Sequence, residues 1–402
     1  MFRLYTEWMD LEYPGKQVVK ESYYIKVVNT KFRLGFMPPR IDTCGRCDQY
    51  NVQLTSATEE DKARIQDEYE AHKDMARRGQ EILKELAASD DADCRVICFD
   101  LQQTLPVPRI STNIAYYKRK LWMYNLCIHD LKANKSKFYV WDKVNEGWGS
   151  VEIVACLNRW IEEEYARAPF HKLKVVTDNS GGQNKNIVIL YYLKQIHDGK
   201  LKIIEHLFLV PGHSYMPCDR AFGNIEKCVR VTGEIYDFEG YCRAIRNAIA
   251  AWYTVIVMQR NEFLDVEKLQ KFITVRWPRP PYGFQDARRF VLKDNFSEGY
   301  LVGMDYNTPL GSVRLVKGTG NYRQNLFDLA AIHLTPKYPH PIQLKKGKVK
   351  HLTELLAFIP EQYRGYLQHI ITKQEQAPEQ TEPHQEEASD EEDKDNTFMD
   401  YN

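Results

Sequence analysis

The chain has 402 residues, of which 43% are hydrophobic and 12% aromatic. That content can bury one or two cores, since domains usually run to ~100–200 residues, and it excludes an intrinsically disordered chain. The formal net charge is zero, but residues 374–402 hold eleven acidic residues and one basic residue, which leaves 54 basic against 44 acidic residues in the body. A positive body favours a polyanionic partner, because Lys and Arg release counterions when they neutralise phosphates; the alternative is a mildly basic surface without a partner.

The cysteines and the first residues indicate the compartment. There are nine cysteines, an odd number, and most lie in apolar runs, as Cys98, Cys127 and Cys156 do. This pattern is typical of buried free thiols in a reducing compartment. The opening MFRLYTEWMDLEYPGK lacks the apolar core of a secretory signal, and no apolar stretch approaches the ~18 residues that span a bilayer. We expect an intracellular protein, nuclear or cytoplasmic, with no membrane partner.

The first 93 residues are predicted to form an N-terminal segment, helical and zinc-knuckle-like. Residues 1 to about 58 are expected to be irregular or in short extended pieces, because Pro38 and Pro39 interrupt any long helix. Cys44 and Cys47 have the two-residue gap of a zinc knuckle, and His72, on a long helix predicted over 59–88, is a third candidate ligand. The fourth ligand is not evident, and a pair of structural thiols is the alternative. Zinc here would pin the segment to the core.

A core domain is predicted over 94–275, where the hydrophobic period changes repeatedly between strand and helix values. Its five predicted strands cover 95–101, 116–131, 137–143, 173–177 and 203–210, and its helices cover 150–168, 187–197 and a stretch that begins near Pro217. The first three strands should form a meander, and the alternation of strands and helices that follows predicts an α/β mixed five-stranded sheet flanked by helices. This is the layout of an RNase H-like fold.

Beyond the fifth strand a long helical region is predicted over 241–272. A small C-terminal β-rich module is expected within 276–373, with antiparallel strands in 289–317 and a closing helix pair over 350–372. The tail, 374–402, is acidic and of low complexity, so it should be disordered.

Three acidic residues occupy equivalent places in the predicted core. Asp100 ends the first strand, Asp178 ends the fourth, and Asp219 opens the helix after the fifth. Sites gather at the carboxyl ends of such strands, so these carboxylates should converge. Clustered carboxylates repel one another unless cations intervene, which favours two Mg²⁺ or Mn²⁺ ions, with Asp100 bridging them. Alternatively, each acid is an ordinary strand end, turn former or helix-start charge.

Other polar residues are weaker candidates. His213 could orient a phosphate or a water, or only cap the strand end; Gln183, Asn184 and Lys185 could bind a phosphate at a helix start, or only cap the helix. Basic residues Lys118 and Arg119 lie between aromatic ones, which suits contact with single-stranded nucleic acid. The pair Gly181-Gly182 lacks the full phosphate-loop pattern, so no nucleoside triphosphate site is expected.

Four segments together resemble a family of transposase-derived proteins with an RNase H-like DDE/D-type integrase domain. They are CGRCD (44–48), FDLQQTLPVP (99–108), VTDNSGGQNKN (176–186) and GHSYMPCDRAFGNIEK (212–227), and the similarity extends from about Phe32 to Ile370. The resemblance implies a metal-dependent polynucleotidyl transferase that nicks DNA and then joins the freed 3′ hydroxyl to a target. Its catalytic acids carry over to Asp100, Asp178 and Asp219, with Glu226, seven positions later on the same helical face, as the rival third acid.

Two other functions compete with this one. The chain could be a host-adopted DNA- or protein-binding module that keeps the fold and has lost catalysis, or a zinc-stabilised scaffold whose acidic tail recruits partners. Strand transfer at two DNA ends implies a homodimer. No helix-turn-helix or full zinc-finger array is recognisable ahead of Cys44 to read transposon ends, so the chain could be a fragment of a longer transposase or could borrow its targeting from elsewhere.

Overall fold

The computed structural model describes residues 2–32, 43–145, 147–249, 252–271, 273–276, 283–294, 296–307, 310–317 and 332–376. The chain divides into two compact units, Met1–Gln49 and Tyr50–Asn402, and the division falls inside one continuous helix, α3. None of the described helices is long and apolar enough to cross a membrane. The acidic tail from 377 onward, Pro38 and Pro39 lie outside the described residues.

The first unit is helical. It contains α1 (Phe2–Glu12), α2 (Glu21–Val27), a π-helical turn η1 (Val28–Phe32) and the first turn of α3 (Gly45–Ser56). The expectation of irregular and extended structure over 1–58 is therefore wrong for the described residues. Aromatic side chains at helical spacing hold α1 and α2 together, as in the stacked pair Tyr5 and Tyr24, with ring centroids 5.0 Å apart. These aromatic residues therefore lie within helices and form the contacts between them.

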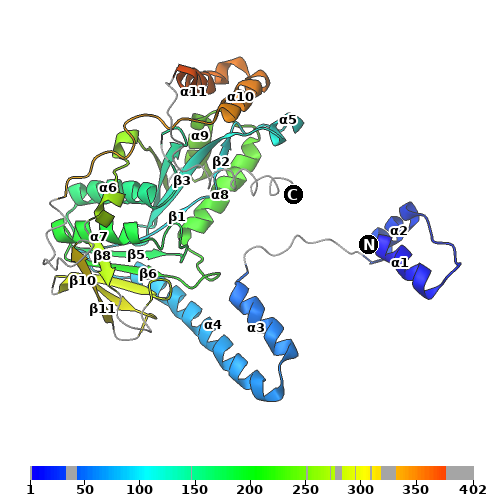
Figure 1. Ribbon diagram of the computed structural model, residues 1–402, viewed down its shortest axis with the longest axis horizontal. Coiled ribbons are helices and arrows are strands. Elements are labelled where there is room, and N and C mark those ends of the chain that lie inside the picture. The colour runs from blue at the N-terminus through cyan, green and yellow to red at the C-terminus, as the bar shows by residue number, and fades with distance from the viewer. Residues whose placement is uncertain are drawn as a thin grey trace. The chain divides into compact units, whose positions relative to one another are not determined.

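The second unit is an α/β structure built on one mixed sheet (Figure 1). Its strands follow the order β7-β4-β3-β1-β5-β6-β9-β10-β11-β8, and β2 pairs with β3. They are β1 (Cys94–Leu101), β2 (Leu105–Val107), β3 (Leu121–Asp130), β4 (Lys135–Asp142), β5 (Lys172–Thr177), β6 (Ile203–Phe208), β7 (Tyr253–Val257), β8 (Ile273–Arg276), β9 (Arg289–Lys293), β10 (Phe296–Gly303) and β11 (Gly311–Lys317).

The predicted meander and its continuation are confirmed. β1, β3 and β4 are antiparallel neighbours, whereas β5 pairs in parallel with β1, and β6 pairs in parallel with β5. Crossover helices make these parallel connections, as the alternating pattern predicted. The predicted strand over 116–131 begins too early, because residues 113–116 form the short helix α5 (Asn113–Tyr116).

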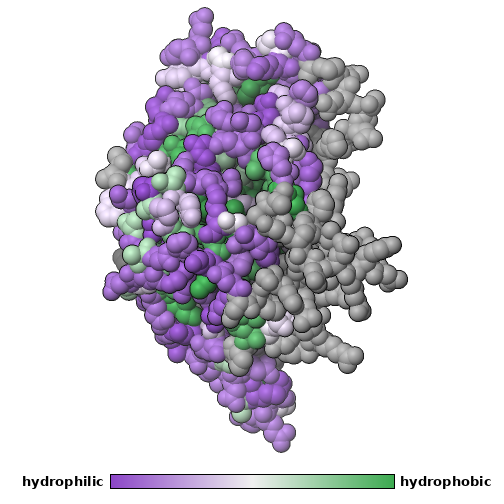
Figure 2. Space-filling view, turned by 90° about the vertical axis from the view of Figure 1, so that its left-hand side faces the viewer, coloured by the Kyte–Doolittle hydropathy of each residue, from purple (hydrophilic) through white to green (hydrophobic). Residues whose placement is uncertain are grey.

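Helices cover the sheet on both faces (Figure 1). One face is covered by α6 (Ser150–Arg167) and α7 (Ile187–Gly199), through residues such as Leu157 and Leu193. The other face packs against α4 (Glu59–Ala87), α8 (Pro217–Thr232), α9 (Phe238–Ala248), α10 (Lys346–Leu355) and α11 (Gly365–Gln376). Hydrophilic residues predominate on the face drawn in Figure 2, and the hydrophobic residues there are scattered among them.

Two predictions of the fold are corrected on the C-terminal side. The region 241–272 is not one helix: α9 ends at Ala248, β7 follows and pairs in parallel with β4, and the 3-10 turns η2 (Arg260–Glu262) and η3 (Val266–Lys271) come next. The β-rich residues are antiparallel as predicted, but β9 pairs with β6, so they extend the core sheet beyond five strands. The closing helix pair is confirmed, with 3-10 turns η5 (Leu356–Phe358) and η6 (Glu361–Tyr363) between its helices.

Candidate functional site

Asp100 and Asp178 lie at the ends of two neighbouring parallel strands. The paired residues of β1 and β5 end at Cys98 opposite Val176, and the same register continued by two residues sets Asp100 beside Asp178. Cys98 and Val176 belong to the core cluster that contains α8. Because side chains alternate between the two faces of a sheet, the acids two positions later face the α8 side as well.

Asp219 reaches the same region from α8. It is the third residue of this helix, where its Oδ2 accepts the backbone N–H of Met216 at 2.7 Å, an N-terminal capping contact. The neighbouring Cys218 is fully buried, and its thiol points at the backbone oxygens of Cys98 and Cys127, 3.7 Å from each. The first turn of α8 therefore packs directly on β1 and β3, close to where β1 ends.

Burial and charge act together on Asp100. The pKa of its carboxyl is raised to about 7, first by burial, then by the negative charge of Asp178, and further by that of Asp219. A hydrogen bond from Asn184 opposes the rise. Because the charges of Asp178 and Asp219 both raise the pKa of Asp100, the three carboxylates lie in one region. Glu226, the rival third acid, is exposed two turns further along α8 and is not among these causes.

Asn184 bridges the first two acids. Its Nδ2 donates to Asp100 Oδ1 at 3.1 Å and to Asp178 Oδ1 at 2.6 Å, and the side chain is fully buried. The amide oxygen of Asn184 is buried without a hydrogen-bond partner. A buried polar atom left unpaired costs ~1–3 kcal/mol, so a further polar group or ion is expected at this place.

A second buried amide pair lies at the end of β1. Asn125 Nδ2 donates to Gln102 Oε1 at 2.8 Å, and both residues are almost fully buried. Gln102 Nε2 and Asn125 Oδ1 have no hydrogen-bond partner. Gln102 follows Asp100 by two positions and Asn125 lies beside it on β3, so this edge of the sheet holds more buried polar atoms than the fold itself uses.

Lys185 anchors the loop that carries Asn184. Its Nζ donates to Asn179 Oδ1 at 2.8 Å and to the backbone oxygens of Gln285 and Ala287, each at 2.6 Å. Burial, followed by the charge of Arg288, lowers the pKa of this amine to about 7. Lys185 is fully buried and fixes the connection between β5 and α7. The expected contact of Lys185 with a phosphate stays a prediction.

Of the other predicted DNA-binding residues, Gln183 lies in the same loop as Lys185, whereas Lys118 and Arg119 lie beside α10. Gln183 is half-buried in the same loop, and its DNA contact stays a prediction. Lys118 forms an ion pair with Glu354 of α10, and the backbone N–H of Arg119 donates to His351 Nδ1 at 3.1 Å. These two residues therefore contact the C-terminal helices, and the neighbouring Tyr116 and Tyr117 are exposed. A contact of this segment with DNA stays a prediction.

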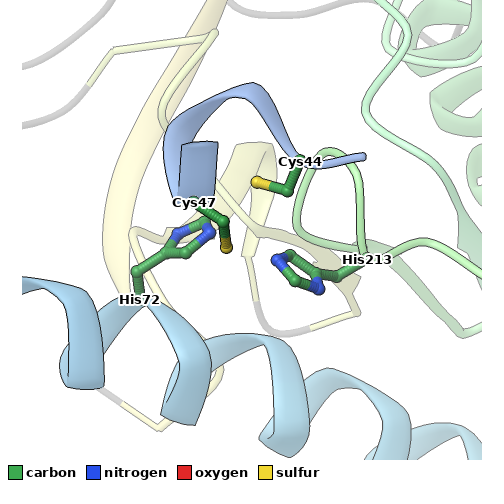
Figure 3. Close-up of side chains that lie close together, drawn as sticks. All are labelled: Cys44, Cys47, His72 and His213. Atoms are coloured by element: carbon green, nitrogen blue, oxygen red, sulfur yellow. The ribbon is translucent and has the colours of Figure 1, made fainter. Parts of the chain in front are cut away.

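The predicted zinc ligands lie together, and a fourth residue joins them. Ligand atoms of Cys44, Cys47, His72 and His213 all lie within 4.8 Å of one another. Figure 3 shows the four side chains pointing toward a common centre from the start of α3, from α4 and from the segment after β6. His213 is thus found among thiols and an imidazole, and its expected role beside the carboxylates stays a prediction.

The continuous helix α3 explains why the two cysteines come to His72. Tyr50, three residues after Cys47, packs its ring against Tyr69 and His72 of α4, with centroid separations of 5.4 and 6.3 Å. The rings of His72 and His213 are 5.2 Å apart. Zinc ligands at ~2.0–2.3 Å from the ion are roughly 3.3–3.8 Å from one another, so a modest contraction would complete a tetrahedral Cys₂His₂ set.

Comparison with known proteins adds no relative. No family model matches the chain, and the searches of curated proteins and of solved structures give no match either. What the site can do therefore rests on its own residues: an oxygen-rich centre at the edge of the sheet, and a separate sulfur and nitrogen cluster.

Proposed function

We propose that this chain is a metal-dependent polynucleotidyl transferase of the DDE/D type, which nicks DNA and transfers the freed 3′ end. The observation that carries the proposal is the meeting of Asp100 with Asp178 at the ends of neighbouring parallel strands, where Asp219 adds its charge. Carboxylates that crowd one another in this way are typical of functional sites, since a fold gains nothing from their repulsion.

The layout of the sheet supports an RNase H-like fold. The antiparallel set β1, β3 and β4 is followed by β5 and β6 on the other side of β1, with α6 and α7 as the intervening helices. This is the succession that the sequence predicted for such a fold. It puts β1 in the middle of the five strands, so Asp100 has a neighbouring acid on one side and a helix start above.

The donor atoms fit Mg²⁺ or Mn²⁺. Three carboxylates and the unpaired oxygen of Asn184 are hard ligands, and no sulfur or imidazole atom is among the contacts of Asp100 and Asp178. Asn184 donates one amide nitrogen to both carboxylates, which places partial positive charge between them, as a cation would. Two bound ions would clamp the attacking and leaving oxygens of a phosphodiester.

The residues of the chain have the task of holding that centre in shape. Lys185 fixes the loop after β5, and Asn184 keeps Asp100 and Asp178 in one orientation. Cys218 packs the start of α8 on the sheet and so sets where Asp219 stands. The DNA partner, and the homodimer that joining two DNA ends requires, belong to the same proposal, as do an intracellular, nuclear location and an origin in a transposable element.

The Cys/His cluster supports a second metal, Zn²⁺, with a structural role. Two thiolates and two imidazoles closed around Zn²⁺ would form the tetrahedral set that structural zinc sites use, with no position left for a substrate. This centre differs in chemistry from the carboxylate centre. The two centres therefore prefer different ions.

The test compares the two candidate third acids on α8. Asp219→Asn should lower Mg²⁺-dependent nicking of supercoiled plasmid DNA by ~100-fold, because removing one carboxylate of a metal centre raises the barrier by several kcal/mol. Glu226→Gln is the matched control and should keep activity within about twofold, as a surface residue outside the centre.

Two results would count against the proposal. Equal losses in both variants would indicate a general effect of charge on DNA binding, not a third metal ligand. No nicking by the parent protein with either Mg²⁺ or Mn²⁺ would instead favour a host-adopted module that binds DNA or protein without catalysis.

A further inference from the structure

His213 belongs to the connection between β6 and α8, residues 209–216. This connection starts at Leu209, whose N–H donates to Thr177 O at 2.9 Å, and turns at Gly212, which has a φ of 74°. A left-handed φ of that size favours glycine, and it reverses the chain so that His213 faces α3 and α4. Asp219 follows six residues after His213.

The same connection is already held to α4 by a side chain. Gln80 Nε2 donates to the backbone oxygens of His213 and Tyr215, at 3.0 and 3.2 Å. His72 lies on α4 two turns before Gln80. The helix thus contacts the connection at two points, one a pair of neutral hydrogen bonds and the other the Cys/His cluster.

A metal would add most at the second point. The four ligand atoms there lie within 4.8 Å of one another, and a Cys₂His₂ set closed around Zn²⁺ contributes folding free energy outright. The metal would therefore strengthen the attachment of this part of the chain to α3 and α4.

We propose that Zn²⁺ bound by Cys44, Cys47, His72 and His213 fastens the connection 209–216 to α3 and α4, and thereby supports the position of Asp219, whose helix turn Cys218 packs on the sheet. Zinc then acts at a distance on the carboxylate centre: its loss loosens the chain before α8 and weakens the hold of the three acids on their own ions. This last step rests on the proposed function, whereas the fastening itself does not.

The choice of Zn²⁺ follows from the ligands. Thiolates select soft or borderline ions over Mg²⁺ and Mn²⁺, and four N and S donors without an open position are typical of structural zinc. Two thiolates also neutralise the charge of the ion, which suits the buried surroundings of Cys44 and His72. The histidines act as positioning residues and touch no substrate.

The experiment measures three properties of the full chain: zinc content by mass spectrometry, hydrogen exchange of residues 209–219, and the Mn²⁺ affinity of the carboxylate centre. The parent should contain one zinc per chain. Replacing it with Co²⁺ should give the visible absorption and thiolate charge-transfer band of a tetrahedral site. Removal of zinc should speed hydrogen exchange in 209–219 at least tenfold and weaken Mn²⁺ binding ~10-fold. A loss of metal affinity of this size is typical when residues that hold metal ligands in place are mutated.

Three variants make the test specific. His213→Ala should lose zinc and reproduce the exchange of the zinc-free parent. His213→Cys should keep zinc, since a Cys₃His set binds it equally well, and should keep both slow exchange and Mn²⁺ affinity. His340→Ala, at an exposed histidine outside the cluster, should behave as the parent. If His213→Ala fails to fold, zinc removal and return in the parent, together with His213→Cys, still decide the question.

Each contrary outcome overturns a different statement. A parent without zinc and without the Co²⁺ spectrum would refute the site, and unchanged exchange after zinc loss would refute the fastening. Altered exchange with unchanged Mn²⁺ affinity would refute the link to Asp219. If the parent binds zinc but no Mn²⁺ at its carboxylates, the proposed transferase function fails, and the link to Asp219 fails with it. The exchange result still decides whether zinc fastens the connection 209–216.

Discussion

Replacing Asp100 or Asp178 with alanine is expected to abolish Mg²⁺-dependent nicking of duplex DNA, with a fall of ~1000-fold or more in rate. Asp100 lies on the central strand and shares a hydrogen-bond donor, Asn184, with Asp178, so its loss would remove a ligand that both ions share in the proposed centre. A thousandfold fall corresponds to about 4 kcal/mol of lost transition-state stabilisation, which a carboxylate of a catalytic metal centre can supply. The rate is measured as conversion of supercoiled to open-circular plasmid under single-turnover conditions.

The matched control for these substitutions is Asp90→Ala. Asp90 is exposed just before β1, at the end of that strand opposite to Asp100. Its replacement by alanine removes one negative charge, as the two test substitutions do. It should retain the parental rate. A parental rate in Asp100→Ala and Asp178→Ala would refute the assignment of these two acids, whatever the behaviour of Asp219.

The second large effect concerns pH and the stability of the protein without Mg²⁺. The raised pKa of Asp100, about 7 in the folded chain against 3.8 as its ordinary value, means that between these values the folded state binds a proton that the unfolded state has released. Stability therefore falls as pH rises from about 4 to 7, and is lowest above 7. One pKa unit corresponds to ~1.4 kcal/mol, so the fall from pH 5 to pH 8 has an upper limit of about 3 kcal/mol.

Urea unfolding of the parent and of Asp100→Asn at pH 5 and pH 8 isolates this contribution. The amide cannot ionise, so Asp100→Asn should be the more stable protein at pH 8 and should differ less from the parent at pH 5. Adding Mg²⁺ should stabilise the parent mainly at pH 8, where the carboxylate is ionised, and Asp100→Asn little at either pH. A parent whose stability rises from pH 5 to pH 8 relative to Asp100→Asn would contradict the raised pKa.

The positions of the three acids were accessible from sequence because they depend on local signals. A short apolar strand that ends in an acid, twice, and a proline-started helix after a third strand predict carboxylates at one edge of a sheet. The structure has Asp100, Asp178 and Asp219 at those places. Cys44, Cys47 and His72 could also be recognised from the sequence as candidate metal ligands, because a two-residue gap between cysteines and a histidine on the following helix are known patterns.

The place of His213 in the Cys/His cluster and the role of Asn184 as a bridge between carboxylates were not predicted. His213 is 141 positions from His72, and what brings them together is the packing of α4 on the connection after β6. For Asn184 and Lys185, their place at a helix start suggested contact with a phosphate, a surface role. Their burial is a tertiary property, and the available signal was only the density of polar residues in VTDNSGGQNKN.

The errors in the predicted fold also come from long-range contacts that the local sequence does not show. Residues 253–257 (YTVIV) are β-branched and aromatic, but they follow α9 so closely that the apolar spacing over 241–272 resembles one helix. Their parallel pairing with β4, more than a hundred residues earlier, decides the matter. The pairing of β9 with β6 likewise extends the sheet through contacts that no local pattern carries.

Diffraction from crystals soaked in Mn²⁺, recorded at the manganese absorption edge, tests most directly whether Asp100, Asp178 and Asp219 form a divalent metal centre. The assignment predicts anomalous peaks bounded by these three carboxylates, and their disappearance in crystals of Asp178→Ala. Carboxylates that remain without manganese at saturating concentration, or manganese bound only at unrelated surface acids, would contradict it.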